Sequence, residues 1–377
     1  MKTFLIAVIA VGIYSGRADA YPQFQMSKDQ TCWGCHISPA GGGLLNENGL
    51  NTAEALSQFG TAPEFLNKLF STPDWLTLGG DFRGAYGYLQ TPEKTIDPIP
   101  MQAELYANAR FGDFILHVTA GARPAEYRNE SSTYFWSREH YIQWQTGAGA
   151  GELFVRVGRF MPVFGLRLAE HPDYTRRYGG TQLYSDTYGA AVEFVKDKYE
   201  VHVTGFIKDP IIDPVAHDNG GAAYGEYRLT DTVAVGAEGM FTRSVDDQKA
   251  RGGLTAKWLV APSFLIQAEG QFVNQQIRGL NSSGQLEYGQ GGAPNQLVAY
   301  VMGSWFVTDP IMVDVGLGHY DENIRIKNLD RDCVDLNVHW FTTSHIELLF
   351  TGRLEVIGQT NGGPTGAYAF LQGHYRL

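Results

Sequence analysis

Two cysteines and a histidine near the start of the chain stand at a spacing that can hold a haem. Cys32, Cys35 and His36 form the motif Cys-Trp-Gly-Cys-His. Two residues between the cysteines give their thiols the reach to form thioethers with both vinyl groups of one porphyrin edge. The histidine that follows is placed to ligate the iron from the proximal side. The motif therefore predicts one covalently attached haem, a haem c.

A redox disulfide, a zinc site and chance are the alternatives to haem at this motif. A disulfide between Cys32 and Cys35 would suit a βαβ setting, which the surrounding pattern lacks. Zinc would need a further cysteine or histidine pair close by in the sequence. Cys333 is the one other cysteine. With the first two bound to haem it has no disulfide partner, and we interpret it as structural.

The first twenty residues predict an export signal. Lys2 precedes an apolar run over residues 4–14, and the small-residue tripeptide Ala18-Asp19-Ala20 follows. This order indicates a signal peptide that is cleaved before Tyr21. No later run reaches the roughly 18 consecutive apolar residues of a membrane-spanning helix. We therefore expect an exported chain whose mature part has no transmembrane helix.

The composition admits a membrane barrel as well as a soluble protein. The 377 residues include 45 glycines and 13% aromatic residues, and they carry a formal net charge of −11. The mean hydropathy of −0.21 would suit a soluble protein, but the polar lumen of a transmembrane β-barrel cancels its apolar outer face in such an average. The acidic balance and the lack of basic runs argue against nucleic acid as a partner.

From residue 75 onward, polar and apolar residues alternate along one segment after another. Clear examples are residues 102–111, 199–204 and 334–340. This period of two gives each predicted strand one polar and one apolar face. A soluble antiparallel sandwich shows the same alternation, so the pattern by itself does not decide between a sandwich and a barrel.

The connections between the predicted strands favour the barrel, because short and long connections alternate. Outer-membrane barrels have short periplasmic turns and long external loops. The pattern predicts an antiparallel transmembrane β-barrel of about 16 strands over residues 75–377, with both ends of the chain on the periplasmic side. Short turns are expected at 112–113, 147–151, 196–198, 230–231, 261–262, 308–310 and 343–344, and longer connections at 91–100, 125–136, 162–183, 208–218 and 278–294, with shorter ones near 245, 327 and 362.

Two further stretches are similar to outer-membrane proteins. The last strand alternates down to Leu377 and resembles the aromatic-rich terminal strand by which such proteins are recognised for assembly, although those commonly end in Phe. Residues 153–180 resemble the strand and third external loop of phosphate-selective-type porins. That resemblance implies a loop that folds into the lumen, while an ordinary solvated loop remains the alternative. The implied constriction residues are Arg167, Glu170, His171, Asp173, Arg176 and Arg177.

Only residues 21–74 are left to house the haem, and we expect a small, mostly helical or irregular segment there. So short a segment has little core of its own, so the barrel must cover part of the macrocycle. A second axial ligand could come from the segment itself, as Met26, or from the barrel wall. Five histidines fall on lumen-facing positions near the periplasmic rim, where a plain polar wall role is the alternative: His117, His202, His339, His345 and His374.

The order of signal peptide (1–20), haem segment (21–74) and barrel (75–377) resembles the fused monohaem cytochrome-porins of the bacterial outer membrane, which include proposed iron oxidases. Cys32, Cys35 and His36 carry over from that family. The resemblance implies electron transfer across or at the outer membrane of a Gram-negative-type bacterium. The implied partners are membrane lipid, periplasmic carriers such as soluble cytochromes, and an external donor or acceptor such as Fe(II).

Two other functions stay open at this point. The barrel can be a solute porin whose haem segment is a structural plug or a redox-sensing gate. A haem enzyme such as a peroxidase is a third interpretation, but no distal acid and base pair is identifiable in the sequence. The direction of electron flow, and with it an Fe(II)-oxidising activity, does not follow from these residues.

Overall fold

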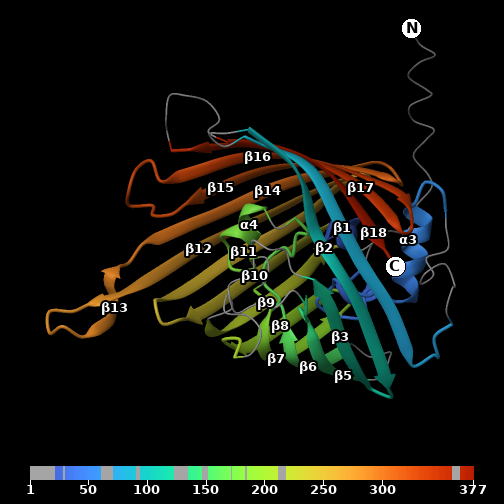
Figure 1. Ribbon diagram of the computed structural model, residues 1–377, viewed down its shortest axis with the longest axis horizontal. Coiled ribbons are helices and arrows are strands. Elements are labelled where there is room, and N and C mark those ends of the chain that lie inside the picture. The colour runs from blue at the N-terminus through green and yellow to red at the C-terminus, as the bar shows by residue number, and fades with distance from the viewer. Residues whose placement is uncertain are drawn as a thin grey trace, which may run out of the picture.

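The computed structural model describes residues 22–28, 30–60, 71–90, 94–122, 135–146, 152–170, 172–182, 185–210, 218–358 and 366–377. The predicted signal peptide lies outside these residues. Within them, one antiparallel sheet of 18 strands closes on itself, because β1 pairs with both β2 and β18. Two short strands, β4 and β13, only extend neighbouring hairpins, so 16 strands form the ring. The predicted all-β, 16-stranded antiparallel barrel is confirmed (Figure 1).

The ring strands follow one another around the barrel in chain order. They are β1 (Leu76–Gln90), β2 (Lys94–Phe111), β3 (Phe114–Ala122), β5 (His140–Gln145), β6 (Glu152–Phe160), β7 (Thr187–Lys196), β8 (Tyr199–Ile207), β9 (Asn219–Thr230), β10 (Val233–Arg243), β11 (Asp247–Ala261), β12 (Phe264–Leu280), β14 (Asn295–Thr308), β15 (Ile311–Asp321), β16 (Asp330–Thr343), β17 (Ile346–Ile357) and β18 (Gly366–Arg376). The two extensions are β4 (Phe135–Trp136) and β13 (Leu286–Gly292).

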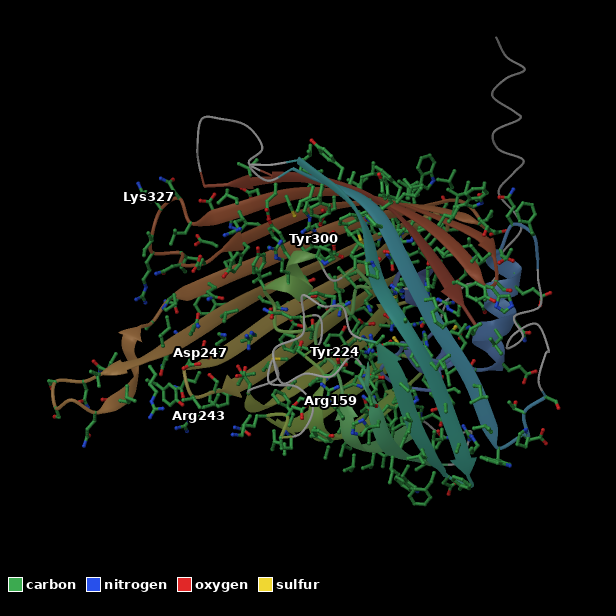
Figure 2. All side chains as sticks on the ribbon, in the orientation of Figure 1. Arg159, Tyr224, Arg243, Asp247, Tyr300 and Lys327 are labelled. Atoms are coloured by element: carbon green, nitrogen blue, oxygen red, sulfur yellow. The ribbon has the colours of Figure 1, made fainter. Side chains whose placement is uncertain are left out.

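The strands bury their polar face and expose their apolar face, the reverse of a soluble sandwich. On β8, Glu200 and His202 point into the barrel and are buried, while the alternating Val201 and Val203 are exposed. Figure 2 shows side chains on both sides of the ring, with Tyr224 and Tyr300 inside it. An apolar outer band with a polar interior is the pattern of a transmembrane barrel. Among the helices of the described residues, none is long and apolar enough to cross a membrane.

Short turns gather at one rim of the barrel, together with the last residue of the chain. The turns that join β2 to β3, β7 to β8, β9 to β10, β11 to β12, β14 to β15 and β16 to β17 each span only a few residues. The backbone N–H of Leu377 donates to Gly80 O at 2.8 Å near the start of β1, which places the carboxyl end at this same rim. We call it the short-turn rim. Exposed aromatic side chains mark it: Trp75, Phe111, Phe114, Tyr199, Trp258, Trp305 and Trp340.

The opposite rim differs from the sequence prediction in two places. The expected loop at 91–100 is largely strand, because β2 begins at Lys94 and pairs with the far end of β1. The expected connection at 278–294 contains the end of β12 and the added strand β13. Figure 1 shows this hairpin projecting well beyond the ring, so long strands replace part of the predicted loops.

The amino-terminal segment fills the barrel at the short-turn rim. It contains three helices, α1 (Pro22–Ser27), α2 (Cys32–Cys35) and α3 (Glu47–Leu56). Phe24 and Leu56 pack with Met312 and Phe341 from the inner wall. Polar contacts add to this, since the Gln25 carboxamide accepts a hydrogen bond from Lys257 of β11. We call residues 22–60 the plug.

A second segment enters the lumen from the other rim. Residues 161–186 join β6 to β7 and carry the short helix α4 (Tyr174–Arg177). The Leu166 N–H donates to Glu269 of β12 at 2.7 Å, and the Tyr174 hydroxyl donates to Glu355 of β17 at 2.6 Å. Both contacts cross the lumen to strands on the far wall. We call residues 161–186 the inward loop, and the structure agrees with the fold that the porin resemblance implied for it.

Candidate functional site

The two cysteines of the motif lie one turn apart on α2. Thr31 caps this helix, because its hydroxyl accepts the Gly34 N–H at 3.2 Å. Residues three apart share one side of a helix, so Cys32 and Cys35 both project from the same side. None of Cys32, Cys35 and Cys333 takes part in a disulfide. The local fold therefore places the two cysteines of the motif on one side of a single helical turn.

His36 follows α2 directly, in extended backbone that bridges to Leu45. Its side chain is buried, with 4% exposed. Neither ring nitrogen has a hydrogen bond of good geometry within the described part of the chain, although backbone groups of Gly42 and Leu44 lie close enough to raise its pKa. Burial, with the nearby positive charge of Arg376, lowers the pKa of His36 to about 4. The imidazole is thus neutral at physiological pH and keeps a lone pair, which is the form that binds a metal ion.

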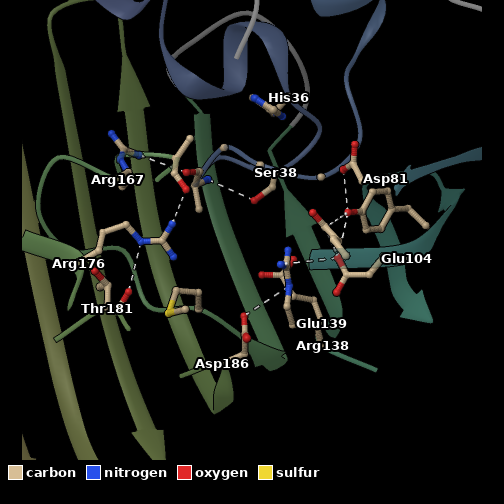
Figure 3. A pocket seen from close by; sticks show the side chains of 18 of the residues that line it. His36, Ser38, Asp81, Glu104, Arg138, Glu139, Arg167, Arg176, Thr181 and Asp186 are labelled. Atoms are coloured by element: carbon tan, nitrogen blue, oxygen red, sulfur yellow. Dashed lines mark hydrogen bonds and ion pairs between the residues drawn. The ribbon is translucent and has the colours of Figure 1, made fainter. Parts of the chain in front are cut away.

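A cavity of about 380 Å³ opens beside His36 (Figure 3). The plug forms one side of it, β1 and β2 form another, and the inward loop forms a third. Gly41, Gly42 and Gly43 line its plug side with φ of 83°, 74° and 60°, a left-handed conformation that favours glycine. A methyl group on Gly41 would lie 3.3 Å from Cys32 Sγ, so this turn borders both the motif and the cavity.

Charged side chains dominate the rest of the cavity wall. Arg156 makes a bidentate pair with Glu193, with two nitrogen-to-oxygen distances of 2.7 Å. Arg167 forms a salt bridge with Glu200, which neutralises its charge. The lining arginines are Arg83, Arg138, Arg156, Arg167, Arg176 and Arg376, and the lining acids are Asp81, Glu104, Glu139 and Asp186.

The cavity wall also holds the plug in place. Arg156 donates to the Ser38 hydroxyl at 3.4 Å, and Arg167 donates to Ala40 O at 3.4 Å. The Gln143 carboxamide donates to Ile37 O at 3.4 Å. These contacts join the residues that follow His36 to β5, β6 and the inward loop. The motif is therefore fixed inside the lumen and not on a separate domain.

All five predicted histidines are buried on the lumen side of the wall, as their positions in the sequence implied. Each is engaged by neighbours, and none of the five lines the cavity beside His36. The contacts of their ring nitrogens are His117 with Asn108 (2.6 Å) and Thr119 (3.1 Å), His202 with Glu193 (3.0 Å), His339 with Glu347 (2.8 Å) and Asp314 (3.1 Å), His345 with Arg376 O (2.8 Å), and His374 with Asp81 (2.7 Å) and Glu347 (3.3 Å).

Met26 is buried in an apolar cluster with Ala234 and Leu265 and does not line the cavity. Two other methionines do, Met101 of β2 and Met161 of the inward loop. Sequence reasoning missed both. Neither carries a motif, and each falls at or next to a predicted loop, where no periodicity assigns a side chain to the lumen.

The predicted constriction residues lie in different positions relative to the cavity. Arg167 and Arg176 line the cavity, and Asp173 lies behind it, 3.5 Å from Arg353 of β17. Glu170 is enclosed at the same loop, where burial raises its pKa. Arg177 is exposed, and His171 lies outside the described residues. Cys333 is buried and donates to Asp335 at 3.7 Å, within a cluster around Tyr174.

No group of three or more His, Cys, Asp or Glu side chains that could hold a metal ion occurs in the described ranges. Cys32, Cys35 and His36 are the residues that would hold a haem beside this cavity. Three observations suit a haem here: two cysteines outside any disulfide, a buried neutral imidazole, and adjoining space walled partly by bare glycine backbone.

Comparisons with known proteins bear on the fold. No protein-family model matches the sequence, and no curated protein matches it. Among solved structures, OmpT of Vibrio cholerae is similar with a TM-score of 0.59 at 13% identity, over 81% of this chain and 99% of that one. An anion-selective porin from Comamonas acidovorans gives a TM-score of 0.57 at 12% identity, over 80% of this chain and 98% of that one.

The outer membrane channel DcaP of Acinetobacter baumannii gives a TM-score of 0.54 at 11% identity, over 82% of this chain and 99% of that one. Each match takes in nearly the whole of the other barrel and leaves about a fifth of this chain over. Identities this low establish the fold alone. The chain thus has the fold of a 16-stranded porin-type β-barrel of the outer membrane.

Proposed function

We propose that this chain is an outer-membrane protein whose plug carries one covalently bound haem inside the lumen. The exposed apolar face of the strands and the likeness to outer-membrane porins support the location. The buried ring of His36, whose nitrogens have no hydrogen bond of good geometry in the described residues, supports the haem. A buried polar group without a good hydrogen bond is costly, so this imidazole next to open space would gain from a ligand.

In this proposal, Cys32 and Cys35 hold the group by thioethers and His36 ligates its iron. The haem would supply reversible one-electron chemistry. The chain would do the rest. Arg156 and Arg167 anchor the plug through Ser38 and Ala40 and so fix the position of His36 within the lumen.

The function that this arrangement supports best is electron transfer across or at the outer membrane. The single observation that carries it is the position of His36, which lies inside the ring and not on a periplasmic appendage. The hydrocarbon layer admits no soluble carrier, so a redox centre held within the lumen shortens the path between the two sides. Periplasmic carriers such as soluble cytochromes would meet the protein at the short-turn rim, and an external donor or acceptor such as Fe(II) at the other.

A second candidate is favoured by the comparisons. The solved structures of similar fold are porins and channels, one of them anion-selective. A solute porin with the haem segment as a structural or redox-sensing plug would have the same fold. The arginines of the cavity would then attract anionic solutes instead of serving a haem.

Proteoliposomes separate the two functions. Oxidised soluble cytochrome c is trapped inside, and a membrane-impermeant reductant is added outside. We expect reduction of the trapped cytochrome with the parent chain and not with the Cys32→Ala/Cys35→Ala double variant. Liposome swelling in small sugars and anions is measured on both. Solute flux without any difference in reduction would favour the porin and contradict electron transfer.

A further inference from the structure

Two arginines lie against one tyrosine at the rim opposite the short turns. Arg243 ends β10 and Arg278 lies near the end of β12, and their guanidinium groups stand 4.8 and 5.7 Å from the ring centroid of Tyr288 on β13. Arg243 Nε also donates to the Tyr288 hydroxyl at 3.2 Å. That hydroxyl donates to Ser244 O at 2.6 Å, and Arg278 donates to Val245 O at 3.3 Å. These contacts hold two cations at one place, and we call Arg243, Arg278 and Tyr288 the basic patch.

The two positive charges of the basic patch are not neutralised within the chain. Among the described residues, neither guanidinium forms an ion pair with a carboxylate. Of the acids on the adjoining turn and hairpin, Asp247 pairs with Lys249 at 3.0 Å and Glu287 accepts a hydrogen bond from Asn281 at 3.2 Å. Asp246 is exposed to solvent. Two like charges held at one ring repel each other, so an anion from outside the chain would stabilise the arrangement.

The basic patch lies on the outer face of the barrel, where the strands leave the apolar band. On β10, Phe241 and Arg243 are exposed and Thr242 between them is buried. β10 has 11 residues, and a strand needs about 9–11 residues to cross the hydrocarbon core. Its last residue, Arg243, therefore stands at the level of lipid head groups. Figure 2 shows Arg243 at the rim from which the β12–β13 hairpin projects.

The outer surface next to the basic patch changes from polar to apolar over three neighbouring strands. Gln248 of β11 lies opposite Arg243 and also opposite Gln276 of β12, to which its carboxamide donates at 2.6 Å. Closer to the middle of the band, three large apolar side chains are exposed: Phe241 of β10, Leu254 of β11 and Phe272 of β12. A molecule with an anionic head and apolar tails would match both parts of this surface.

We propose that the basic patch binds the phosphate group of a lipid in the external leaflet, with the acyl chains of that lipid on the apolar outer face of β10, β11 and β12. The rim is external because outer-membrane barrels carry their short turns on the periplasmic side. An arginine fork matches phosphate and binds it through charge-assisted hydrogen bonds. Cations at the membrane surface attract anionic lipids in the same way. The lipid site depends on the membrane location and needs no haem, so it goes beyond electron transfer.

Native mass spectrometry of the detergent-solubilised protein tests the lipid site. Bisphosphorylated lipid A and the same lipid stripped of its phosphates are titrated onto the parent, Arg243→Gln, Arg278→Gln and the double variant. Lys327→Gln is the control, because Lys327 is an exposed cation at the same rim, in the turn between β15 and β16. Heat-modifiable gel mobility shows that each variant is folded.

We expect the parent to bind phosphorylated lipid A more tightly than the stripped lipid. Each single variant should weaken binding of the phosphorylated lipid about fivefold and the double variant about 25-fold, as the attraction of one surface cation for anionic lipid implies. None of these changes should affect the stripped lipid. Lys327→Gln should match the parent. Arg243→Lys and Arg278→Lys, which keep the charge, should retain most of the binding.

Three outcomes would contradict the lipid site. Equal binding of the two lipids by the parent would mean that the apolar face alone holds them. If the double variant loses inorganic phosphate but binds lipid A as the parent does, the basic patch serves a free anion. If the double variant separates into single chains while the parent stays oligomeric and binds no lipid, the patch joins two copies of the chain. Should the glutamine variants not fold, the comparison of the two lipids on the parent and on the lysine variants decides.

Discussion

Trp33, which stands between the two cysteines of the motif, packs against Phe154 of β6 with ring centroids 5.7 Å apart. Phe154 is fully buried on the inner face of the barrel. The contact joins the motif directly to the wall. The plug and the barrel therefore share one core at the short-turn rim, and a change on either side affects the other.

Phe154→Ala should loosen the plug. Truncating a fully buried phenylalanine typically costs about 3–5 kcal/mol, part of it from the cavity left behind. We expect faster proteolysis of residues 22–60 in the folded, detergent-solubilised protein and a lower temperature for the gel-mobility transition. Val157→Ala, on the exposed outer face of the same strand, is the matched control and should change neither. Equal proteolysis of the two variants would mean that the plug is held by other contacts.

The proposed covalent haem would depend on Cys32 and Cys35. Replacing both by alanine should abolish the haem stain of the membrane-inserted protein, because no thioether can then form, and either single replacement should weaken it by removing one of the two thioethers. Cys333→Ala removes a buried thiol elsewhere and should keep the stain. Extraction of haem from the denatured parent by acid acetone would contradict the covalent attachment.

The barrel should behave as a membrane-inserted one. Unheated protein is expected to migrate faster on a denaturing gel than boiled protein, as folded outer-membrane barrels do. The protein should also remain in the outer-membrane fraction after salt washing. Recovery of the folded chain in a soluble periplasmic extract would contradict the membrane location.

The second axial ligand can be sought among residues that line the cavity. Loss of an axial thioether lowers a haem reduction potential, so we expect Met101→Ala or Met161→Ala to lower it and to remove the optical signature of methionine ligation. Alanine variants of Met26, His117, His202, His339, His345 and His374 should leave the spin state unchanged, because these side chains are engaged elsewhere. A changed spin state in one of the histidine variants would instead support the histidine set that the sequence indicated.

The stability of the folded protein should depend on pH through the protonation of Asp186. Burial raises its pKa from 3.8 to about 6. The folded state therefore binds this proton more tightly than the unfolded state does. The stabilisation of the fold by protonated Asp186 is complete below pH 3.8 and is lost as pH rises to about 6. The loss is at most ~3 kcal/mol. Asp186→Asn should flatten the dependence of the gel-mobility transition on pH between 4 and 7. An unchanged slope would mean that Asp186 is ionised throughout.

The ring of strands was predictable because alternation and turn spacing are local signals. On β8, the sequence alone assigns Glu200 and His202 to one face, and both are buried in the lumen. The start of β2 was not predictable from such signals. Pro98 and Pro100 indicate a loop, yet they pair with Tyr86 and Gly84 across a register shift at the far end of β1.

The site was predictable only in part. Cys32, Cys35 and His36 follow from their spacing, but the cavity depends on contacts between distant parts of the chain. Ser38 and Arg156 are 118 residues apart in the sequence, and Ala40 and Arg167 are 127 apart. No periodicity encodes which strand a plug residue will touch. That Met101 and Met161 line the cavity could therefore be found only in three dimensions.

The plug lies against the seam at which the barrel closes, and this has a consequence for biogenesis. Leu44 is packed so closely on Gly79 of β1 that a methyl group there would lie 2.4 Å from Leu44 Cδ2. Cys35 and His36 each expose only 4% of their surface once β1 has paired with β18. An enzyme that attaches haem cannot reach groups so enclosed. If the chain carries haem, the haem must therefore be attached before the barrel closes. A cell without the enzymes that attach haem would then insert a barrel without haem, and haem supplied later could not be attached.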